Sequence, residues 1–348
     1  MPKKSSHTPR LRILLVKLSS FGDVIHTLPT LEALREAFPP AHITWLVEEA
    51  YAGLLRGHPA LDEVWPAPRV RLNQGRGIQG AAEMARLTRR LWQQPFDLVI
   101  DLQGLLKSAI WVFLARSRRK VGYDCTRELS YLALTERLPP FDPEAHAVRR
   151  YLNLARYLGA PPTPPRFRFG FPISFEPSKF QMTDRPLVVL HPGARWATKL
   201  WPPPLWAQLA DWLARDQGLQ VAITGSAGDR PLAEEILAFM REPARNLAGR
   251  TSLEELAGLM AHAAFAITAD TGPMHLAAAL GTRVVAIFGP TAPWRTGPFG
   301  EGHQIVRLVL ECSPCFQRQC PEPRCLLDLS PALVQSACEK ILSDMEIS

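Results

Sequence analysis

Asp23 and Asp270 each follow an apolar run and lie a few residues before a histidine, a pattern that could perform acid–base chemistry or bind a ligand. The runs are Leu11–Leu18 and Phe265–Thr268, and an amphipathic segment follows each of them. This order is typical of a buried parallel strand that leads into a helix, and open α/β sheets bind ligands at the carboxyl edge of their strands. One such edge falls in each half of the chain, so the sequence predicts two sheets that face each other across a cleft.

The turn that carries Asp23 is built of small residues, Ser19, Ser20 and Gly22, at the start of a helical segment. An ionised aspartate held there can accept a proton from an incoming hydroxyl group, as general-base catalysis requires. Ser and Asp also satisfy the N–H groups of a first helical turn, and the helix dipole stabilises such a carboxylate. The motif alone leaves the catalytic and the capping interpretation equally open.

Two cations follow the first apolar run of the second half. The segment 191–202 combines a glycine turn with Arg195 and Lys199, and then a helix that begins with proline. Cations beside a helix N-terminus form a site for an anion such as phosphate, and a surface loop with two unrelated charges is the alternative. Asp229 follows a further strand and could accept hydrogen bonds from ribose hydroxyls or simply cap a helix.

The segment from Asp270 to His275 gives the clearest prediction of an anion site. Pro273 suits a first helical turn, with Asp270 or Thr271 as the cap. The N–H groups of Thr271 and Gly272 would point outward at an anion, and His275 lies one turn further on. A lone histidine is more often structural, but here it completes a pocket that Asp270, Thr271, Gly272 and His275 are expected to line.

Positive charge is concentrated between residues 66 and 120. This segment has eleven Lys or Arg and three acidic residues, a net of +8, whereas the whole chain carries +7. Such a run is either a solvated basic face or a surface for an anionic partner. A phosphorylated lipid fits better than nucleic acid, because aromatic residues do not alternate with the arginines as in recognition modules. The cations assigned to such a partner are Lys107, Arg116, Arg118 and Arg119.

Apolar runs alternate with segments of helical spacing along both halves, which predicts α/β domains with parallel sheets. A proline-rich stretch at 159–165 interrupts this alternation, and Pro, Phe and Arg stay frequent to about residue 185. We therefore expect a domain at 1–160, a linker at 161–185 and a second domain at 186–348. The main expected strands lie at 11–18, 43–47, 63–65, 96–102, 187–190, 219–224, 265–268 and 283–288.

The composition is that of a globular protein, with 47% apolar residues. No stretch approaches the roughly 18 uncharged apolar residues that a membrane helix needs. The N-terminal residues are polar and basic, and no signal-peptide core follows them. These features predict a cytoplasmic location.

Four cysteines, Cys312, Cys315, Cys320 and Cys325, lie close together near the C-terminus. The first pair has the C-x-x-C spacing of metal sites, but zinc sites usually have a longer gap before the second pair. A structural metal clip, a redox-labile disulfide and plain buried thiols all stay open. Nothing in the segment indicates catalysis.

Several segments together resemble the ADP-heptose:lipopolysaccharide heptosyltransferases of glycosyltransferase family 9. They are 12–29, 47–49, 101–109, 191–202 and 270–275, so the resemblance spans nearly the whole chain. The combination of Lys-x-Ser-Ser-x-Gly-Asp with Asp-Thr-Gly-x-x-His is specific. The Asp-x-Gln-Gly-Leu-x-Lys-Ser segment is more similar to type I members, which add the first heptose to Kdo-lipid A, than to type II. The C-terminal cysteines are not part of the family's shared core.

The resemblance implies a GT-B fold, in which two Rossmann-like domains hold the active site between them. It implies that Asp23 is the general base and that Lys199 is a second catalytic group, which holds the ADP diphosphate. It also implies inversion at the anomeric centre without a metal ion or other cofactor. The donor-binding residues are then Ser19, Ser20, Gly22, Arg195, Asp229, Asp270, Thr271, Gly272 and His275.

This resemblance implies a transferase that moves L-glycero-D-manno-heptose from ADP-heptose to Kdo-lipid A during synthesis of the lipopolysaccharide inner core. Its expected place is the cytoplasmic face of the inner membrane, as a peripheral protein that docks on anionic lipid. One alternative is a type II or other family 9 sugar transferase. Others are a nucleotide-sugar epimerase of the same fold and a non-catalytic, nucleotide-dependent membrane scaffold, which would bind without turnover.

Overall fold

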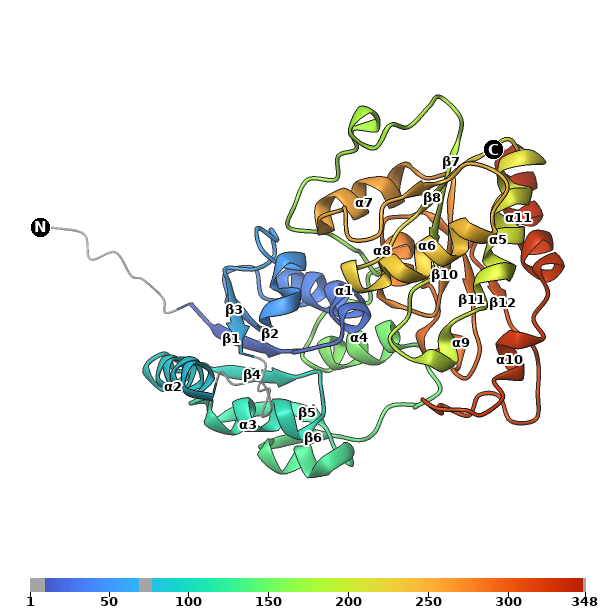
Figure 1. The fold of residues 1–348 in the computed structure, drawn as a ribbon. Helices are drawn as coiled ribbons and strands as arrows, with labels where there is room; N and C mark the ends of the chain where they lie inside the picture. The colour runs from blue at the N-terminus through green and yellow to red at the C-terminus, as the bar shows by residue number, and fades with distance from the viewer. Residues whose placement is uncertain (1–9, 69–76, 347–348) are drawn as a thin grey trace, which may run out of the picture. The chain divides into compact units, whose positions relative to one another are not determined.

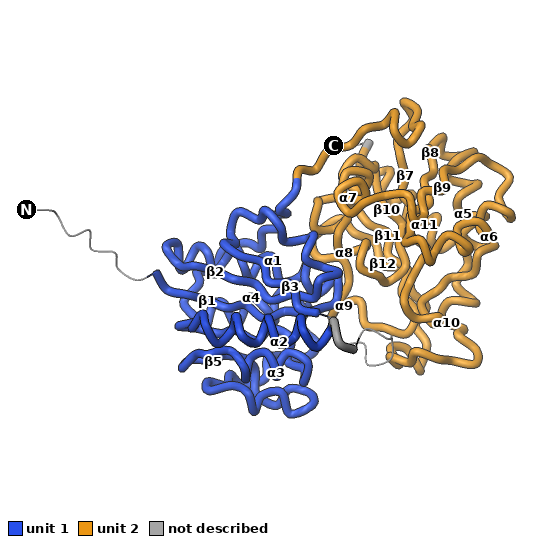
Figure 2. The backbone as a smooth tube through the Cα atoms, turned by 60° about the vertical axis from the view of Figure 1, so that its left-hand side comes forward, with its two compact units in different colours: residues 1–171 blue, residues 172–348 orange. Residues whose placement is uncertain are grey.

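The computed structural model of the protein describes residues 10–68 and 77–346 (Figure 1). The chain divides into two compact units, residues 1–171 and 172–348 (Figure 2). The division falls inside the segment 161–185, where the composition changes. Within the described residues, no helix combines the length and the apolar character needed to cross a membrane.

Unit 1 contains a six-stranded parallel sheet in the order β3-β2-β1-β4-β5-β6. The sheet has two halves, which extend outward from the central pair β1 and β4. This strand order is that of a Rossmann fold. The strands are β1 (Arg12–Val16), β2 (His42–Glu48), β3 (Glu63–Ala67), β4 (Leu98–Asp101), β5 (Arg119–Tyr123) and β6 (Glu136–Leu138). The helical segments are α1 (Phe21–Ala37), η1 (Glu49–Leu54), α2 (Gly77–Gln93), α3 (Leu106–Leu114), η2 (Arg127–Ala133) and α4 (Ala147–Tyr157).

Unit 2 repeats the same strand order in a second parallel sheet, β12-β11-β10-β7-β8-β9. The strands are β7 (Leu187–His191), β8 (Gln220–Ile223), β9 (Arg245–Asn246), β10 (Phe265–Ala269), β11 (Arg283–Ile287) and β12 (Gln304–Val306). The longer helices are α5 (Pro203–Arg215), α6 (Arg230–Phe239), α7 (Leu253–His262), α8 (Gly272–Ala279) and α11 (Pro331–Glu346). Short helical segments are η3 (Pro177–Phe180), η4 (Ala197–Lys199), η5 (Ala227–Asp229), α9 (Pro293–Thr296) and α10 (Arg324–Leu327).

The central strands are apolar runs because helices cover both faces of each sheet. All five residues of β10 are buried, as are the last four of β1. Trp201 and Trp206 pack edge to face beside α5 and fill one side of the second core. The apolar strands thus fix the sheets, and the polar residues that follow them are held at the carboxyl edges.

The structure confirms the α/β class, the two Rossmann-like sheets and the strands expected from the apolar runs. Four strands, β5, β6, β9 and β12, were not expected. β6, β9 and β12 have only two or three residues and lie at the edges of their sheets, where charged residues are common, whereas β5 lies between β4 and β6. β5 starts with Arg119 and Lys120, and β9 consists of Arg245–Asn246, so neither contains an apolar run. The four-residue helices α9 and α10 were not expected either.

Candidate active site

Both sheets place polar residues at the point where the strand order reverses. In unit 1 this switch point lies between β1 and β4, and in unit 2 it lies between β7 and β10. The connections after the two strands leave in opposite directions there, which opens a crevice at the carboxyl edge. Lys17 follows β1, and Asp270 follows β10. The two sets of predicted site residues therefore lie where such sheets bind ligands.

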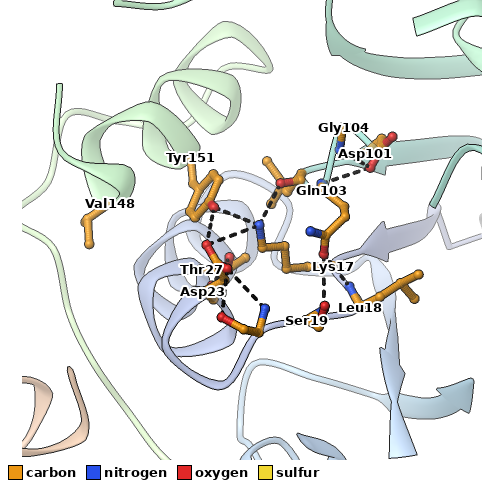
Figure 3. A network of polar contacts seen from close by, with 12 residues as sticks. Lys17, Leu18, Ser19, Asp23, Thr27, Asp101, Gln103, Gly104, Val148 and Tyr151 are labelled. Atoms are coloured by element: carbon orange, nitrogen blue, oxygen red, sulfur yellow. Dashed lines mark hydrogen bonds and ion pairs between the residues drawn. The ribbon is translucent and has the colours of Figure 1, made fainter. Parts of the chain in front are cut away.

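Asp23 is fixed at the start of α1 by the residue that precedes the helix (Figure 3). The backbone N–H of Ser20 donates to Asp23 Oδ2 at 3.1 Å, and the Ser20 hydroxyl donates to the same oxygen at 3.0 Å. Oδ2 is thus the capping atom of this helix. The side chain is still 34% exposed, so the capping role leaves the carboxylate accessible.

The other carboxylate oxygen belongs to a buried network with Lys17 and Tyr151 (Figure 3). The Tyr151 hydroxyl donates to Asp23 Oδ1 at 2.8 Å, and Lys17 Nζ lies 3.6 Å from that oxygen. Lys17 Nζ also donates to the Tyr151 hydroxyl at 2.7 Å and to the carbonyl of Leu102 at 3.1 Å. Tyr151 comes from α4, and only 2% of the Lys17 side chain is exposed.

This network keeps Asp23 ionised. Burial favours the neutral carboxyl, but the Lys17 ammonium and the Ser20 N–H stabilise the anion more strongly, so the pKa of Asp23 lies well below its ordinary value. Burial and the nearby Asp23 charge raise the pKa of Tyr151 well above 10, so its hydroxyl stays a donor. Burial lowers the pKa of Lys17, and Asp23 opposes that shift. The site thus presents an oriented carboxylate that can accept a proton from a bound hydroxyl group.

A second group of side chains lies beside the Asp23 turn. Lys107 Nζ donates to Glu48 Oε1 at 2.8 Å and also to the Ser19 hydroxyl. Gln103 Oε1 accepts from the N–H groups of Leu18 and Ser19, each at 3.1 Å. These contacts tie the loop after β1 to the residues after β4 and at the end of β2. The structure thereby brings Ser19, Ser20, Asp23 and Lys107 together, and Gly22 is buried in the first turn of α1.

The three predicted arginines lie elsewhere in unit 1. Arg119 begins β5 and makes a bidentate ion pair with Glu136, with distances of 2.7 and 3.0 Å. Arg116 and Arg118 are exposed in the loop that enters β5. Because all strands are parallel, this loop lies at the amino edge of the sheet, opposite the edge that carries Asp23. The arginines are therefore not part of the Asp23 cluster.

In unit 2, Lys199 and Asp270 form an ion pair at the switch point. Lys199 Nζ lies 2.5 Å from Asp270 Oδ2, and the Thr291 hydroxyl donates to the same oxygen at 2.5 Å. The ammonium also lies 4.7 Å from the centre of the Trp196 ring. Asp270 is buried, whereas the Lys199 side chain is 16% exposed. The ammonium group is therefore paired with a buried carboxylate and is still partly accessible from the surface.

Asp229 ends η5, in the connection that follows the neighbouring strand β8, and its side chain packs against two glycines. Ser226 donates to Asp229 Oδ2 from both its N–H and its hydroxyl, each at 2.7 Å. A Cβ added to Gly193 would lie 2.7 Å from the Asp229 carboxylate, and one added to Gly225 would lie 2.7 Å from Asp229 Cβ. Both loops therefore need glycine at these positions. Asp229 also caps the local turn, so the structure supports the capping interpretation and leaves one carboxylate oxygen for another partner.

The histidine at the end of β7 is neutral. Burial lowers the pKa of His191 to about 4, an effect that the Asp229 charge opposes only in part. Its Nδ1 lies 3.0 Å from the Thr224 hydroxyl, which also donates to the Leu190 carbonyl. His191 therefore supports the loop geometry rather than supplying charge.

The remaining residues predicted to bind the donor lie at the start of α8 or in the loop after β7. Thr271 is the extended residue before the helix, Gly272 is its first residue, and His275 is buried in its first turn. The Thr271 side chain makes no capping hydrogen bond, and the first N–H groups of a helix have no partner within it. Arg195 is exposed in the loop after β7. The first N–H groups of α8 and the Lys199 ammonium are groups with which this edge could bind an anion.

The four C-terminal cysteines line one cavity of about 320 Å³. All are free thiols, with Cys312 and Cys320 exposed and Cys325 buried. Burial and the nearby thiols raise the pKa of Cys325. Throughout residues 10–68 and 77–346, no group of His, Cys, Asp or Glu is placed so that it could hold a metal ion. The four thiols are thus free in the structure, but only Cys325 is buried as the third alternative expected.

Sequence reasoning missed four side chains of the Asp23 cluster. Lys17, Glu48 and Gln103 each lie at or directly after the end of a strand, so the rule that identified Asp23 could have identified them. Tyr151 had no such signal, because it lies inside α4 and meets Asp23 across 128 residues of sequence. Its helical segment contains no pattern that indicates this contact.

Comparison with known proteins identifies the family of the chain. A sequence model of the family described as "Glycosyltransferase family 9 (heptosyltransferase)" matches residues 84–326. Lipopolysaccharide heptosyltransferase 1 of Pseudomonas aeruginosa is 34% identical, over 95% of this chain and 98% of the relative. The relatives also include lipopolysaccharide heptosyltransferase 2 of Salmonella typhimurium, 30% identical over 96% of this chain and 99% of its own length.

Solved structures of heptosyltransferases share the fold. The Escherichia coli enzyme WaaC with ADP-2-deoxy-2-fluoro heptose matches with a TM-score of 0.75 and 29% identity, over 95% of this chain and 99% of that one. These neighbours confirm that the two Rossmann-like units form a GT-B fold. The chain therefore belongs to glycosyltransferase family 9, and it is a heptosyltransferase of lipopolysaccharide core synthesis.

Proposed function

We propose that the protein transfers L-glycero-D-manno-heptose from ADP-heptose to Kdo-lipid A, with inversion at the anomeric carbon. The observation that carries the proposal is the Asp23 carboxylate, which is oriented, ionised and one-third exposed at the switch point of unit 1. The similarity to heptosyltransferase 1 of Pseudomonas aeruginosa supports the type I reaction.

Asp23 acts as the general base in this proposal. The hydroxyl oxygen of the acceptor attacks the anomeric carbon, the bond from that carbon to the diphosphate breaks, and ADP leaves with the bonding electrons. Asp23 accepts the hydroxyl proton as the new C–O bond forms. Its low pKa makes it a weak base toward a free alcohol, but the attacking oxygen becomes acidic as it gains positive charge. Lys17 and Tyr151 are positioning residues, because they act through the carboxylate.

The donor is held by unit 2 in this proposal. Negative charge grows on the diphosphate as the sugar bond breaks, and the Lys199 ammonium with the first N–H groups of α8 would stabilise it. Asp270 and Thr291 fix Lys199 in place, so the cation is oriented before the donor binds. Asp229 would accept from the ribose hydroxyls, while Arg195 and His275 would complete the donor site. No metal ion or other cofactor is required in this scheme.

The acceptor is a lipid, and the proposal places the protein on the cytoplasmic face of the inner membrane. Lys107 lies near Asp23 and suits an acidic sugar or phosphate close to the reacting hydroxyl. Arg116 and Arg118 lie at the opposite edge of the sheet and suit lipid phosphates, whereas Arg119 is already paired with Glu136. We accordingly assign Lys107 to the sugar end of the acceptor and the arginines to the membrane surface.

A comparison of two acceptors tests the proposal. The purified protein is incubated with ADP-heptose and either Kdo-lipid A or Kdo-lipid A that already carries one heptose, and the product mass is measured. Addition of one heptose to the first acceptor alone is the expected result. Reaction only with the second acceptor would instead make the protein a type II enzyme, the alternative that the similarity to heptosyltransferase 2 favours. If ADP-heptose is converted to another sugar nucleotide and heptose is transferred to neither acceptor, the protein is an epimerase.

A further inference from the structure

Helix α3 exposes an apolar face. Leu106, Ile110 and Phe113 recur at spacings of four and three residues, so they share one side of the helix. They are between 45% and 73% exposed. The opposite side, with Trp111 and Val112, is buried in the core of unit 1. The outward face of α3 is therefore apolar like its inward face. A helix that faces water usually carries polar residues on its outward face.

Segment η2 extends this apolar area. η2 packs against α3, as the ribbon also shows (Figure 1), and Glu128 accepts a hydrogen bond from the N–H of Leu106 at 2.9 Å. Leu129 and Leu132 are 61% and 62% exposed. Single exposed apolar residues are ordinary, but a contiguous group marks a surface for a partner. We name the group formed by Leu106, Ile110, Phe113, Leu129 and Leu132 the α3–η2 surface.

The charges around this surface identify the partner. Between residues 103 and 138 the chain has seven Lys or Arg and three acidic residues, a net of +4. Exposed Arg116 and Arg118 follow α3, and exposed Arg127 begins η2. An apolar face bordered by cations matches the interface of an anionic bilayer, which offers hydrocarbon beneath phosphate groups. A second copy of the chain would bring like charges together, which disfavours self-association through this face.

We infer that the α3–η2 surface inserts into the interfacial region of an anionic phospholipid bilayer. Phe113 and its apolar neighbours enter the acyl boundary, while Arg116, Arg118 and Arg127 contact lipid phosphates. This inference rests on the proposed function in so far as a lipid acceptor requires a membrane-bound enzyme. It goes further because it predicts an apolar contribution that salt does not screen, whereas binding through the arginines alone would be lost at high salt.

Flotation with vesicles of phosphatidylglycerol and phosphatidylethanolamine tests this inference. Phe113→Ser should reduce the bound fraction about tenfold, because a largely exposed phenyl ring is lost from the apolar contact. Phe239→Ser is the matched control, since this side chain is 53% exposed on α6 of unit 2. The double variant Arg116→Gln, Arg118→Gln should bind vesicles more weakly than the wild type at low salt. At high salt the wild type should keep some vesicle binding, and Phe113→Ser should lose it.

Three results would overturn the inference. They are unchanged flotation of Phe113→Ser, an equal loss in Phe239→Ser, and a wild-type dimer in sedimentation velocity without lipid that Phe113→Ser dissociates. Unchanged thermal unfolding shows that the variant is folded. Transfer to a soluble, delipidated Kdo acceptor tests the proposed function separately. Phe113→Ser should retain that turnover, whereas a wild type that floats but transfers nothing would contradict the proposed function alone.

Discussion

Lys17→Met should raise the pH at which the Asp23 carboxylate titrates. Lys17 Nζ lies 3.6 Å from Asp23 Oδ1 in the structure. Coulomb's law gives such a pair about 5 kcal/mol at an effective dielectric constant of about 20 and about 1 kcal/mol in bulk water. The carboxylate is one-third exposed, so the interaction lies between these limits. Loss of the ammonium should therefore raise the pKa of Asp23 by about 1 to 3 units.

The sign of the effect on rate follows from the role of a base. A general base is active when ionised, so kcat/KM falls as the pH falls through the pKa of Asp23. In the wild type this pKa lies well below its ordinary value, and no loss of rate from Asp23 is expected above pH about 5. In Lys17→Met, burial still favours the neutral carboxyl without an opposing ammonium, so the loss should appear at higher pH.

The assay is the pH profile of kcat/KM with a soluble acceptor. Lys340→Met is the matched control, because it removes an exposed lysine of α11 and should leave the profile unchanged. The Leu102 carbonyl loses a donor in Lys17→Met, with a cost of about 1–3 kcal/mol, so thermal unfolding must be recorded first. ADP binding should be retained. A folded Lys17→Met enzyme with the wild-type acid limb would refute the coupling of Lys17 to the base.

Further substitutions test the Asp23 cluster of unit 1 and the Lys199 site of unit 2 separately. Tyr151→Phe deletes the hydroxyl that donates to Asp23 Oδ1 and should move the acid limb of kcat/KM in the same direction, which the same pH profile measures. Lys199→Ala should weaken ADP binding about 10- to 100-fold in calorimetry and also lower kcat, and unchanged values of both would remove it from the site. Gly193→Ala forces a Cβ against the Asp229 carboxylate and should lower stability by about 1–3 kcal/mol and weaken ADP binding. Gly80→Ala has open space around the added atom and should do neither.

The fold was predictable where the chain buries both faces of a strand. β1 and β10 are apolar runs that fit a buried strand. In the segments between the strands, apolar residues recur at helical spacing. β5 was missed because Arg119 and Lys120 begin it, and its pairing with β4 is decided by the sheet rather than by its own side chains. Local sequence patterns report local burial, and β5 is fully buried only at Val121 and Gly122.

The site was predictable in so far as it follows from strand ends. Asp23, Lys199 and Asp270 were identified from their place after apolar runs, and the structure puts Lys199 and Asp270 in contact. Tyr151 could not be found, because its contact with Asp23 depends on how α4 packs against α1. Nor did the sequence interpretation separate Lys107, which lies near Asp23, from Arg116 and Arg118, which lie at the opposite edge of the sheet.

The central claim is that Asp23 removes a proton from the acceptor, and Asp23→Asn tests it most directly. Asparagine keeps the size of the side chain and can still accept from the Ser20 N–H, so folding and ADP affinity should persist. Asp184→Asn, at an exposed position of unit 2, controls for the loss of one carboxylate. We expect a kcat for Kdo-lipid A that is about 10²- to 10⁴-fold lower, with ADP affinity unchanged. A folded Asp23→Asn enzyme that retains more than half of the wild-type kcat would contradict the central claim.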